Sequence, residues 1–137
     1  MSSAIPETFP TLTISQPYAG LIMASVKDVE SRSWATKYRG PLAVHAGMQR
    51  HRDDPGVPVT ASMRVQGRDE ALALDEVYGA LLGWVTLVDV VTDHPSQWAQ
   101  ESMFHWVLAE PRLLDEALPM QGKQGLWRYQ PAPSPAF

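Results

Sequence analysis

The chain has 137 residues, of which 45% are hydrophobic and 19% are charged, the composition of one globular domain with a buried core. It contains no cysteine, which excludes disulfides and thiolate chemistry. The first residues lack a basic start followed by an apolar run, and no apolar stretch reaches the roughly 20 residues of a membrane span. We therefore expect a cytoplasmic protein without a membrane partner.

The net charge of −4 is unevenly distributed along the chain. Residues 27–52 carry a local charge of +4, whereas residues 53–137 carry −7. The acidic total argues against a polyanion as partner, but the basic segment could form a patch that binds phosphate. A solvated charged surface is the alternative, because neighbours in sequence need not be neighbours in space.

The first elements of the chain are a strand and a short helix. Alternating, β-rich residues predict a strand at 11–15, and apolar residues then recur at helical spacing over 18–26. Pro17 fits the first turn of this helix, with Ser15 or Gln16 as its cap.

The rest of the chain predicts further strands, short helices and one long loop. Strands are expected at 27–34, 41–46, 80–91, 104–114 (ended or bulged at Pro111) and 126–130; helical segments at 69–79 and 94–102; and an exposed loop at 48–68. This pattern predicts an α+β fold, a small barrel of about five or six strands with two or three short helices. We expect the domain at 11–130, an N-terminal extension at 1–10 and a proline-rich tail at 131–137.

The segment "KDVESRSW", residues 27–34, concentrates side chains that could bind a nucleic acid. Alternation in a strand puts four of them on one face: Asp28, Glu30, Arg32 and Trp34. A guanidinium can contact phosphate or guanine, and an indole can stack on a base for about 1–3 kcal/mol. The structural alternative is an exposed ion pair worth about 0–1 kcal/mol beside a core tryptophan.

Six segments in order resemble the ASCH domain, the activating-signal-cointegrator homology family. They are "SQPYAGLI", "VKDVESRSW", "RGPLAVHAG", "GWVTLVDVV", "FHWVLAEPR" and "GKQGLWRY", from about Leu12 to Tyr129. This resemblance implies a PUA-like barrel with a cleft between the first helix and the sheet, and a role related to nucleic acids or nucleotides. Members of the family are described as RNA- or DNA-binding modules, some as amidohydrolases of 4-acetylcytidine, and one line as a ribonuclease.

The resemblance also places a functional lysine at Lys27, either as a phosphate contact or as a catalytic group of lowered pKa. In the amidohydrolase branch, a threonine three positions after this lysine is the nucleophile. This chain has Glu30 at that position, and a carboxylate cannot serve as the hydroxyl nucleophile. The departure counts against deacetylation.

Five further residues are candidates for ligand contact. Gln16 and Pro17 resemble the family's motif at the head of the first helix, where free N–H groups could bind an anion. Tyr18 could stack on a base, and Arg39, in a turn, could contact phosphate. His45 could bind a base or phosphate, although a lone strand histidine is more often a hydrogen-bonded core group.

The sequence thus predicts a domain that recognises single-stranded RNA or a modified nucleotide in the cleft. The alternative is a metal-independent ribonuclease or nucleoside amidohydrolase, with Lys27 and Glu30 as catalytic groups. A second alternative is a protein-interaction module that uses the 48–68 loop. No cofactor or metal is expected, because the histidines form no known metal-binding motif.

Overall fold

The computed structural model describes residue 8 and residues 10–51, 62–64 and 71–129. In chain order its elements are β1 (Pro10–Gln16), α1 (Tyr18–Met23), β2 (Val29–Arg32), β3 (Gly40–Arg50), β4 (Ser62–Arg64), β5 (Ala71–Ala73), the 3-10 helix η1 (Leu74–Glu76), β6 (Ala80–Val91), β7 (Phe104–Pro119) and β8 (Leu126–Arg128). No helix of the described residues is long and apolar enough to cross a membrane.

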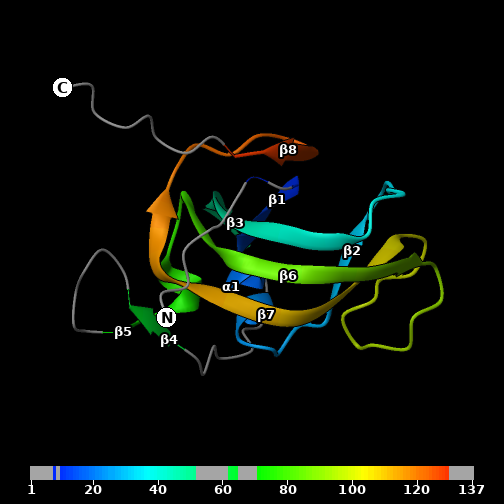
Figure 1. The fold of residues 1–137 in the computed structure, drawn as a ribbon. Helices are drawn as coiled ribbons and strands as arrows, with labels where there is room; N and C mark the ends of the chain where they lie inside the picture. Colours follow the sequence, from blue (N-terminus) through cyan, green and yellow to red (C-terminus); the bar gives the residue numbers. More distant parts are fainter. Residues whose placement is uncertain (1–7, 9, 52–61, 65–70, 130–137) are drawn as a thin grey trace.

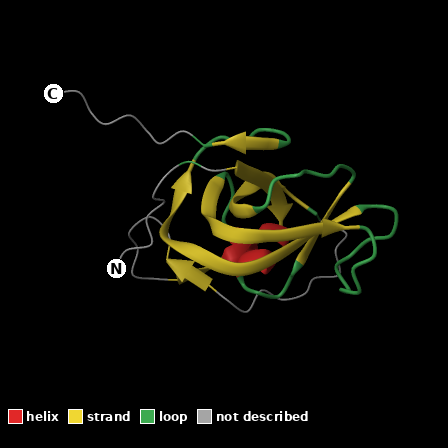
Figure 2. Ribbon diagram, turned by 45° about the vertical axis from the view of Figure 1, so that its right-hand side comes forward, coloured by secondary structure: helices red, strands yellow, loops and turns green. Residues whose placement is uncertain are grey.

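Six of the strands form one mixed sheet in the order β2-β7-β6-β3-β1-β8, and β4 pairs with β5. The β1–β3 pair is parallel, and the other pairs of the large sheet are antiparallel. The long strands curve around α1, which lies inside the bend of the sheet (Figures 1 and 2). The expected α+β, barrel-like class is confirmed, and the sheet is not closed, because its two edge strands, β2 and β8, do not pair with each other.

The centre of the sheet is buried on both faces. In β3, residues 42–47 are all buried, and apart from His45 their side chains are apolar or small in both orientations. The larger core lies on the side of α1 and includes Leu12, Val44 and Trp106. A smaller core, with Ala43 and Tyr129, covers the other face. This double burial explains why the segment lacks a clear polar–apolar alternation.

The short helix expected after the first strand is confirmed as α1, and Gln16 holds its start. The side-chain oxygen of Gln16 accepts a hydrogen bond from the Gly20 N–H (3.0 Å), while its amide nitrogen donates to the carbonyls of Leu74 (2.8 Å) and Val77 (2.7 Å). A Cβ on Gly20 would lie 2.7 Å from the backbone nitrogen of Asp75. Only glycine therefore allows α1 to pack this closely against η1.

The prediction of a helix at 69–79 is wrong. The described part of this segment contains the short strand β5 and the 3-10 helix η1. The apolar spacing that suggested a helix includes Leu74 and Val77, which are three residues apart and both buried. A spacing of three fits a single 3-10 turn as well as an α-helix, and pairing with β4 decides the conformation of the residues before it.

Residues 94–102 form a turn with no helix. Side chains of this segment accept the hydrogen bonds of backbone N–H groups. The Ser96 N–H donates to Nδ1 of His94 (3.0 Å), and the Trp98 N–H donates to Oγ of Ser96 (3.1 Å). One backbone bond, from the Ala99 N–H to the Ser96 carbonyl (3.0 Å), closes the turn. Local side-chain acceptors of this kind compete with helix formation.

The bulge expected at Pro111 is confirmed. Strand β7 continues through Pro111 to Pro119, and its register with β6 shifts between Trp84 and Thr86, opposite residues 109–112. Glu110 has a φ of 54°, the left-handed conformation that an extra residue adopts in such a bulge.

The segment expected as an exposed loop, residues 48–68, contains the end of β3, up to Arg50, and strand β4. Residues 48–51 are exposed, as expected. The other parts of the segment, 52–61 and 65–68, lie outside the described residues, as do most of the N-terminal extension and the proline-rich tail.

Candidate nucleotide-binding cavity

A cavity of about 810 Å³ lies at the unclosed side of the sheet, between β1 and β2. We call it the first cavity; its volume falls within the range of small-molecule sites. Strands β1 and β2, the start of α1, the end of β3 and the turn before β7 all contribute to it. Its lining includes Thr13, Ser15, Tyr18, Lys27, Glu30, Ser31, Arg32, Ser33, Trp34, Gly47, Met48, Gln49, His51, Gln97, Trp98, Gln100 and Met103.

Three charged side chains, Lys27, Glu30 and Arg32, form one cluster in this cavity, which we call the charged triad. The Lys27 Nζ lies 3.5 Å from Oε1 of Glu30, and it donates a hydrogen bond to the Val29 carbonyl (2.7 Å). Both Nε and Nη2 of Arg32 lie 3.0 Å from Oε2 of Glu30. The carboxylate is therefore held between two cations, and the triad carries a net charge of +1.

The triad is buried enough to perturb the ionisation of Lys27. The Lys27 side chain is 6% exposed, that of Glu30 is 11% exposed and that of Arg32 is 24% exposed. Burial lowers the pKa of the Lys27 ammonium, and the attraction of the Glu30 carboxylate opposes this shift without cancelling it. Lys27 is thus a cation that releases its proton more readily than an ordinary surface lysine.

Arg32 connects β2 to β1, two strands that do not pair with each other in the sheet. Its Nη2 donates to the backbone carbonyl of Thr13 in β1 (2.9 Å), while its own backbone belongs to β2. Among the described residues, the Nη1 group of Arg32 has no hydrogen-bond partner. One edge of the guanidinium therefore holds the fold together, and the other is available to an anion.

Aromatic rings surround the ammonium of Lys27. Its Nζ lies 5.2 Å from the ring centroid of Tyr18 and 5.1 Å from that of Trp98, within cation–π range. The Tyr18 ring in turn lies 5.0 Å from the ring of His51. Trp34 also lines the cavity, but it packs edge-on against the buried Trp106 at 4.8 Å. The cavity thus combines the positively charged groups of Lys27 and Arg32 with flat aromatic surfaces.

Five of the sequence-predicted residues meet in the first cavity: Tyr18, Lys27, Glu30, Arg32 and Trp34. Asp28, which alternation put on the same face, lies elsewhere. Its carboxylate accepts a hydrogen bond from Oγ of Ser96 (2.6 Å), because regular strand geometry begins only at Val29.

Four predicted ligand residues lie outside this cavity. Gln16 is fully buried, and its amide bonds to backbone groups. Pro17 is buried at the N-cap of α1. Arg39 lies on the exposed surface, where its Nη2 is 3.2 Å from Oδ1 of Asp89. His45 is buried in β3 on the other side of Thr13.

His45, which is buried, belongs to a second polar group that is partly buried, which we call the neutral network: Trp127, Thr13 and His45. The Trp127 Nε1 donates to Oγ1 of Thr13 (3.1 Å), which lies 3.2 Å from Nδ1 of His45. The Nε2 of His45 is 2.8 Å from the Met120 carbonyl, an acceptor only, so Nε2 carries the proton. Burial lowers the pKa of His45 despite this hydrogen bond.

Sequence reasoning missed Trp98 and His51 as lining residues. Trp98 is fixed by a hydrogen bond from its Nε1 to the Val26 carbonyl (3.0 Å), which brings the turn before β7 against the start of β2. The one available signal was a tryptophan in a polar segment without a strand pattern. His51 follows β3 directly, and its position depends on the full length of that strand.

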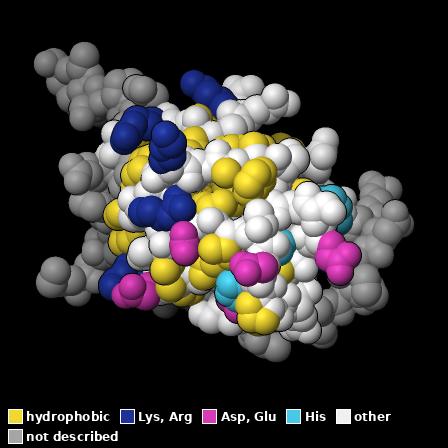
Figure 3. Space-filling view, turned by 90° about the vertical axis from the view of Figure 1, so that its right-hand side faces the viewer, with side chains coloured by type: hydrophobic (Ala, Val, Ile, Leu, Met, Phe, Trp, Pro, Cys, Tyr) yellow, Lys and Arg dark blue, Asp and Glu magenta, His cyan; other side chains and the backbone are white. Residues whose placement is uncertain are grey.

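The basic segment 27–52 does not form one patch at the cavity. Of its basic residues that the structure describes, only Lys27 and Arg32 line the cavity, whereas Arg39 pairs with Asp89 and Arg50 with Asp75, from the acidic part of the chain. Arg52 lies outside the described residues. On the face shown in Figure 3, Lys and Arg side chains gather at the left and upper left, and acidic side chains lie beside and below them and continue to the right.

Comparison with known proteins assigns the chain to a family. Residues 12–118 match the ASCH domain. Activating signal cointegrator 1 of Mus musculus is 29% identical over 125 residues, and the Homo sapiens protein of the same name is 27% identical over 125 residues. Each alignment covers 85% of this chain and 22% of the relative, so the chain spans about a fifth of these proteins' length. This chain belongs to the ASCH domain family, and that membership supports a nucleic-acid-binding domain in general terms.

Proposed function

We propose that this domain binds cytoplasmic single-stranded RNA, or a modified nucleotide, in the first cavity. The observation that carries the proposal is the charged triad, a buried net positive charge in a cavity lined by aromatic rings. A nucleotide has the complementary chemistry, an anionic phosphate joined through a sugar to a flat heteroaromatic ring.

In this proposal Arg32 contacts the phosphate, because its Nη1 group faces no partner among the described residues. Lys27 adds long-range attraction but is largely committed to Glu30 and the Val29 carbonyl. Glu30 has the task of orienting both cations, since each of its oxygens faces one of them. Arg39 is not assigned a role, because it lies away from the cavity and pairs with Asp89.

The base would lie against the aromatic rings. Tyr18 and Trp98 flank the ammonium of Lys27, and Trp34 adds a further apolar surface. The carboxamides of Gln97 and Gln100, also in the lining, offer donors and acceptors to a base edge. Stacking contributes about 1–3 kcal/mol per base to the binding free energy. This contribution can compensate for the weak electrostatic attraction of a site whose net charge is only +1.

Single-stranded RNA fits this site better than a duplex. The only α-helix of the described residues has six residues, five of them buried, so it cannot enter a groove. The total charge of −4 also disfavours binding that depends on many phosphates.

The test is titration of a labelled random-sequence single-stranded RNA with the protein at low and moderate salt, read by fluorescence anisotropy. We expect binding that weakens with salt and falls about tenfold or more in Arg32→Ala. Arg112→Ala, which removes an exposed arginine from β7, is the matched control and should bind normally. Equal loss in both variants, or no binding by the native protein, would reject the proposal.

A second candidate, a metal-independent ribonuclease, is favoured by one observation. The Lys27 Nζ has a lowered pKa and lies 3.5 Å from the Glu30 carboxylate, as expected of an acid–base pair. The RNA 2′-hydroxyl would attack phosphorus while Glu30 takes its proton, and the 5′-oxygen would leave with a proton from Lys27. A gel of the same titration tests this. RNA shortened in the presence of chelator by the native protein, but not by Lys27→Met, would identify the enzyme.

A further inference from the structure

A second cavity, of about 660 Å³, adjoins the first and shares four lining residues with it: Thr13, Gly47, Met48 and Gln49. Gly47, one of these shared residues, is buried and packs closely against Thr13. A Cβ there would lie 3.1 Å from Cγ2 of Thr13. The two cavities therefore adjoin at the end of β3, with these four residues as their common wall.

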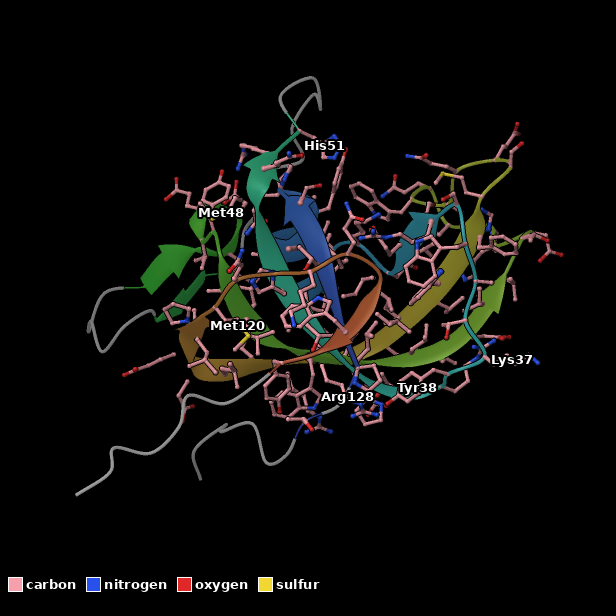
Figure 4. The ribbon with its side chains drawn as sticks, turned by 90° about the horizontal axis from the view of Figure 1, so that it is seen from above. Lys37, Tyr38, Met48, His51, Met120 and Arg128 are labelled. Atoms are coloured by element: carbon pink, nitrogen blue, oxygen red, sulfur yellow. The ribbon has the colours of Figure 1, made fainter. Side chains whose placement is uncertain are left out.

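The second cavity differs chemically from the first. Its other lining residues are His45, Gly79, Met120, Gln121, Gly122, Lys123 and Gln124, which include a single charged side chain. Met48 is 76% exposed and Met120 is half-buried. Figure 4 shows both methionines on the same side of the molecule, whereas Lys37, Tyr38 and Arg128 lie toward the other end of β3.

These groups suit a base together with its phosphate. Thioethers make favourable contacts with aromatic rings, and the glutamine carboxamides can pair with base edges. Lys123 is exposed and has no ion-pair partner in the described part of the chain, so it can meet a phosphate at the rim. Arg32, across the shared residues, can meet the phosphate on the first-cavity side.

We propose that the second cavity binds the neighbouring nucleotide of the same RNA strand, with its base against Met48 and Met120 and its phosphate near Lys123. This inference rests on the proposed function of the first cavity and narrows it. The ligand is a strand of at least two nucleotides, and an isolated nucleotide fills only one of the two cavities.

The test is calorimetric titration of the full chain with each 5′-mononucleotide and with a random-sequence RNA tetranucleotide pool. We expect the tetranucleotides to bind about tenfold or more tightly than any mononucleotide, because a second base is in contact. Met120→Ala and Lys123→Ala should remove most of this gain and leave mononucleotide binding unchanged. Both residues line only the second cavity of the two.

The matched controls are Leu118→Ala and Lys37→Ala, an exposed apolar residue and an exposed lysine that line neither cavity. Thermal unfolding checks that each variant is folded. Equal affinity for mononucleotides and tetranucleotides, or a full gain in Met120→Ala and Lys123→Ala, would overturn the second site and leave the first intact. No binding of either probe would reject RNA as the ligand, and the second site with it.

Discussion

The charged triad and the neutral network lie on either side of Thr13, and they satisfy their polar side chains in different ways. Both bury polar side chains next to the sheet, and both bond to Thr13, one through its carbonyl and the other through its hydroxyl. The neutral network satisfies its groups with neutral hydrogen bonds, a reliable way to stabilise a core. The triad places three charges where apolar side chains would often serve stability as well. This difference agrees with the binding role that we propose for the triad.

The largest expected effect comes from removing the carboxylate that both cations share. Glu30→Gln leaves Lys27 and Arg32 buried without a counter-charge, and we expect the free energy of unfolding to fall by about 3 kcal/mol. Urea denaturation at neutral pH measures this, with the exposed Glu101→Gln as control. A loss under about 1 kcal/mol would mean that water already screens the triad, as it does surface pairs.

The neutral network should show a smaller effect that is confined to stability. Thr13→Val keeps the carbonyl that Arg32 uses but removes the hydroxyl between Trp127 and His45. We expect a loss of about 1–2 kcal/mol in the free energy of unfolding and RNA affinity within twofold of native. Thr92→Val, at an exposed position, is the control. A large loss of RNA affinity would show that the two groups are not independent.

The two groups should also respond to pH in different ranges. Burial lowers the pKa of Lys27 from its ordinary value of 10.5, so between the two values the unfolded chain binds more protons than the folded chain. Stability should therefore rise with pH as it approaches 10.5, relative to Lys27→Met at each pH. Urea denaturation from pH 7 upward gives this difference. If the difference in the free energy of unfolding between the native protein and Lys27→Met stays constant from pH 7 upward, the lowered pKa of Lys27 is contradicted.

The smallest expected effect is at acid pH, in the neutral network. The pKa of His45 is lowered from 6.5, so its contribution to stability is complete above 6.5 and is lost as pH falls toward the folded-state value. The native protein should lose stability faster than His45→Gln below pH 6.5, as thermal unfolding in matched buffers would show. Thr92→Val, which changes no titratable group at an exposed position, should follow the native curve.

Much of the fold could be predicted from local pattern. Strands β1, β3, β6, β7 and β8 and helix α1 all follow from alternation, apolar runs and a change of period. The segment 69–79 could not, because three-residue spacing fits two kinds of helix and pairing with β4 is a long-range contact. Likewise, the open side of the sheet depends on pairing between distant strands.

The candidate site was predictable where a single strand carries it. Glu30 and Arg32 lie on β2, two residues apart, so alternation was enough to bring them together. His45 and Arg39 failed to join them for a different reason. They lie at different points along β3 and its preceding turn, and neither reaches the cavity. Trp98 was missed because no local pattern shows that a turn folds back against Val26.

The hydrogen bond from Arg32 to the Thr13 carbonyl has a consequence for motion. It is a side-chain link where the sheet lacks a backbone ladder, so β2 and β1 are joined there by one guanidinium. A phosphate that engages Arg32 would restrain this guanidinium, and the width of the gap would then depend on occupancy. Amide hydrogen exchange in β2 should slow when ligand is bound, even at residues that do not touch it. The separation of β1 and β2 would thus report whether the first cavity is occupied.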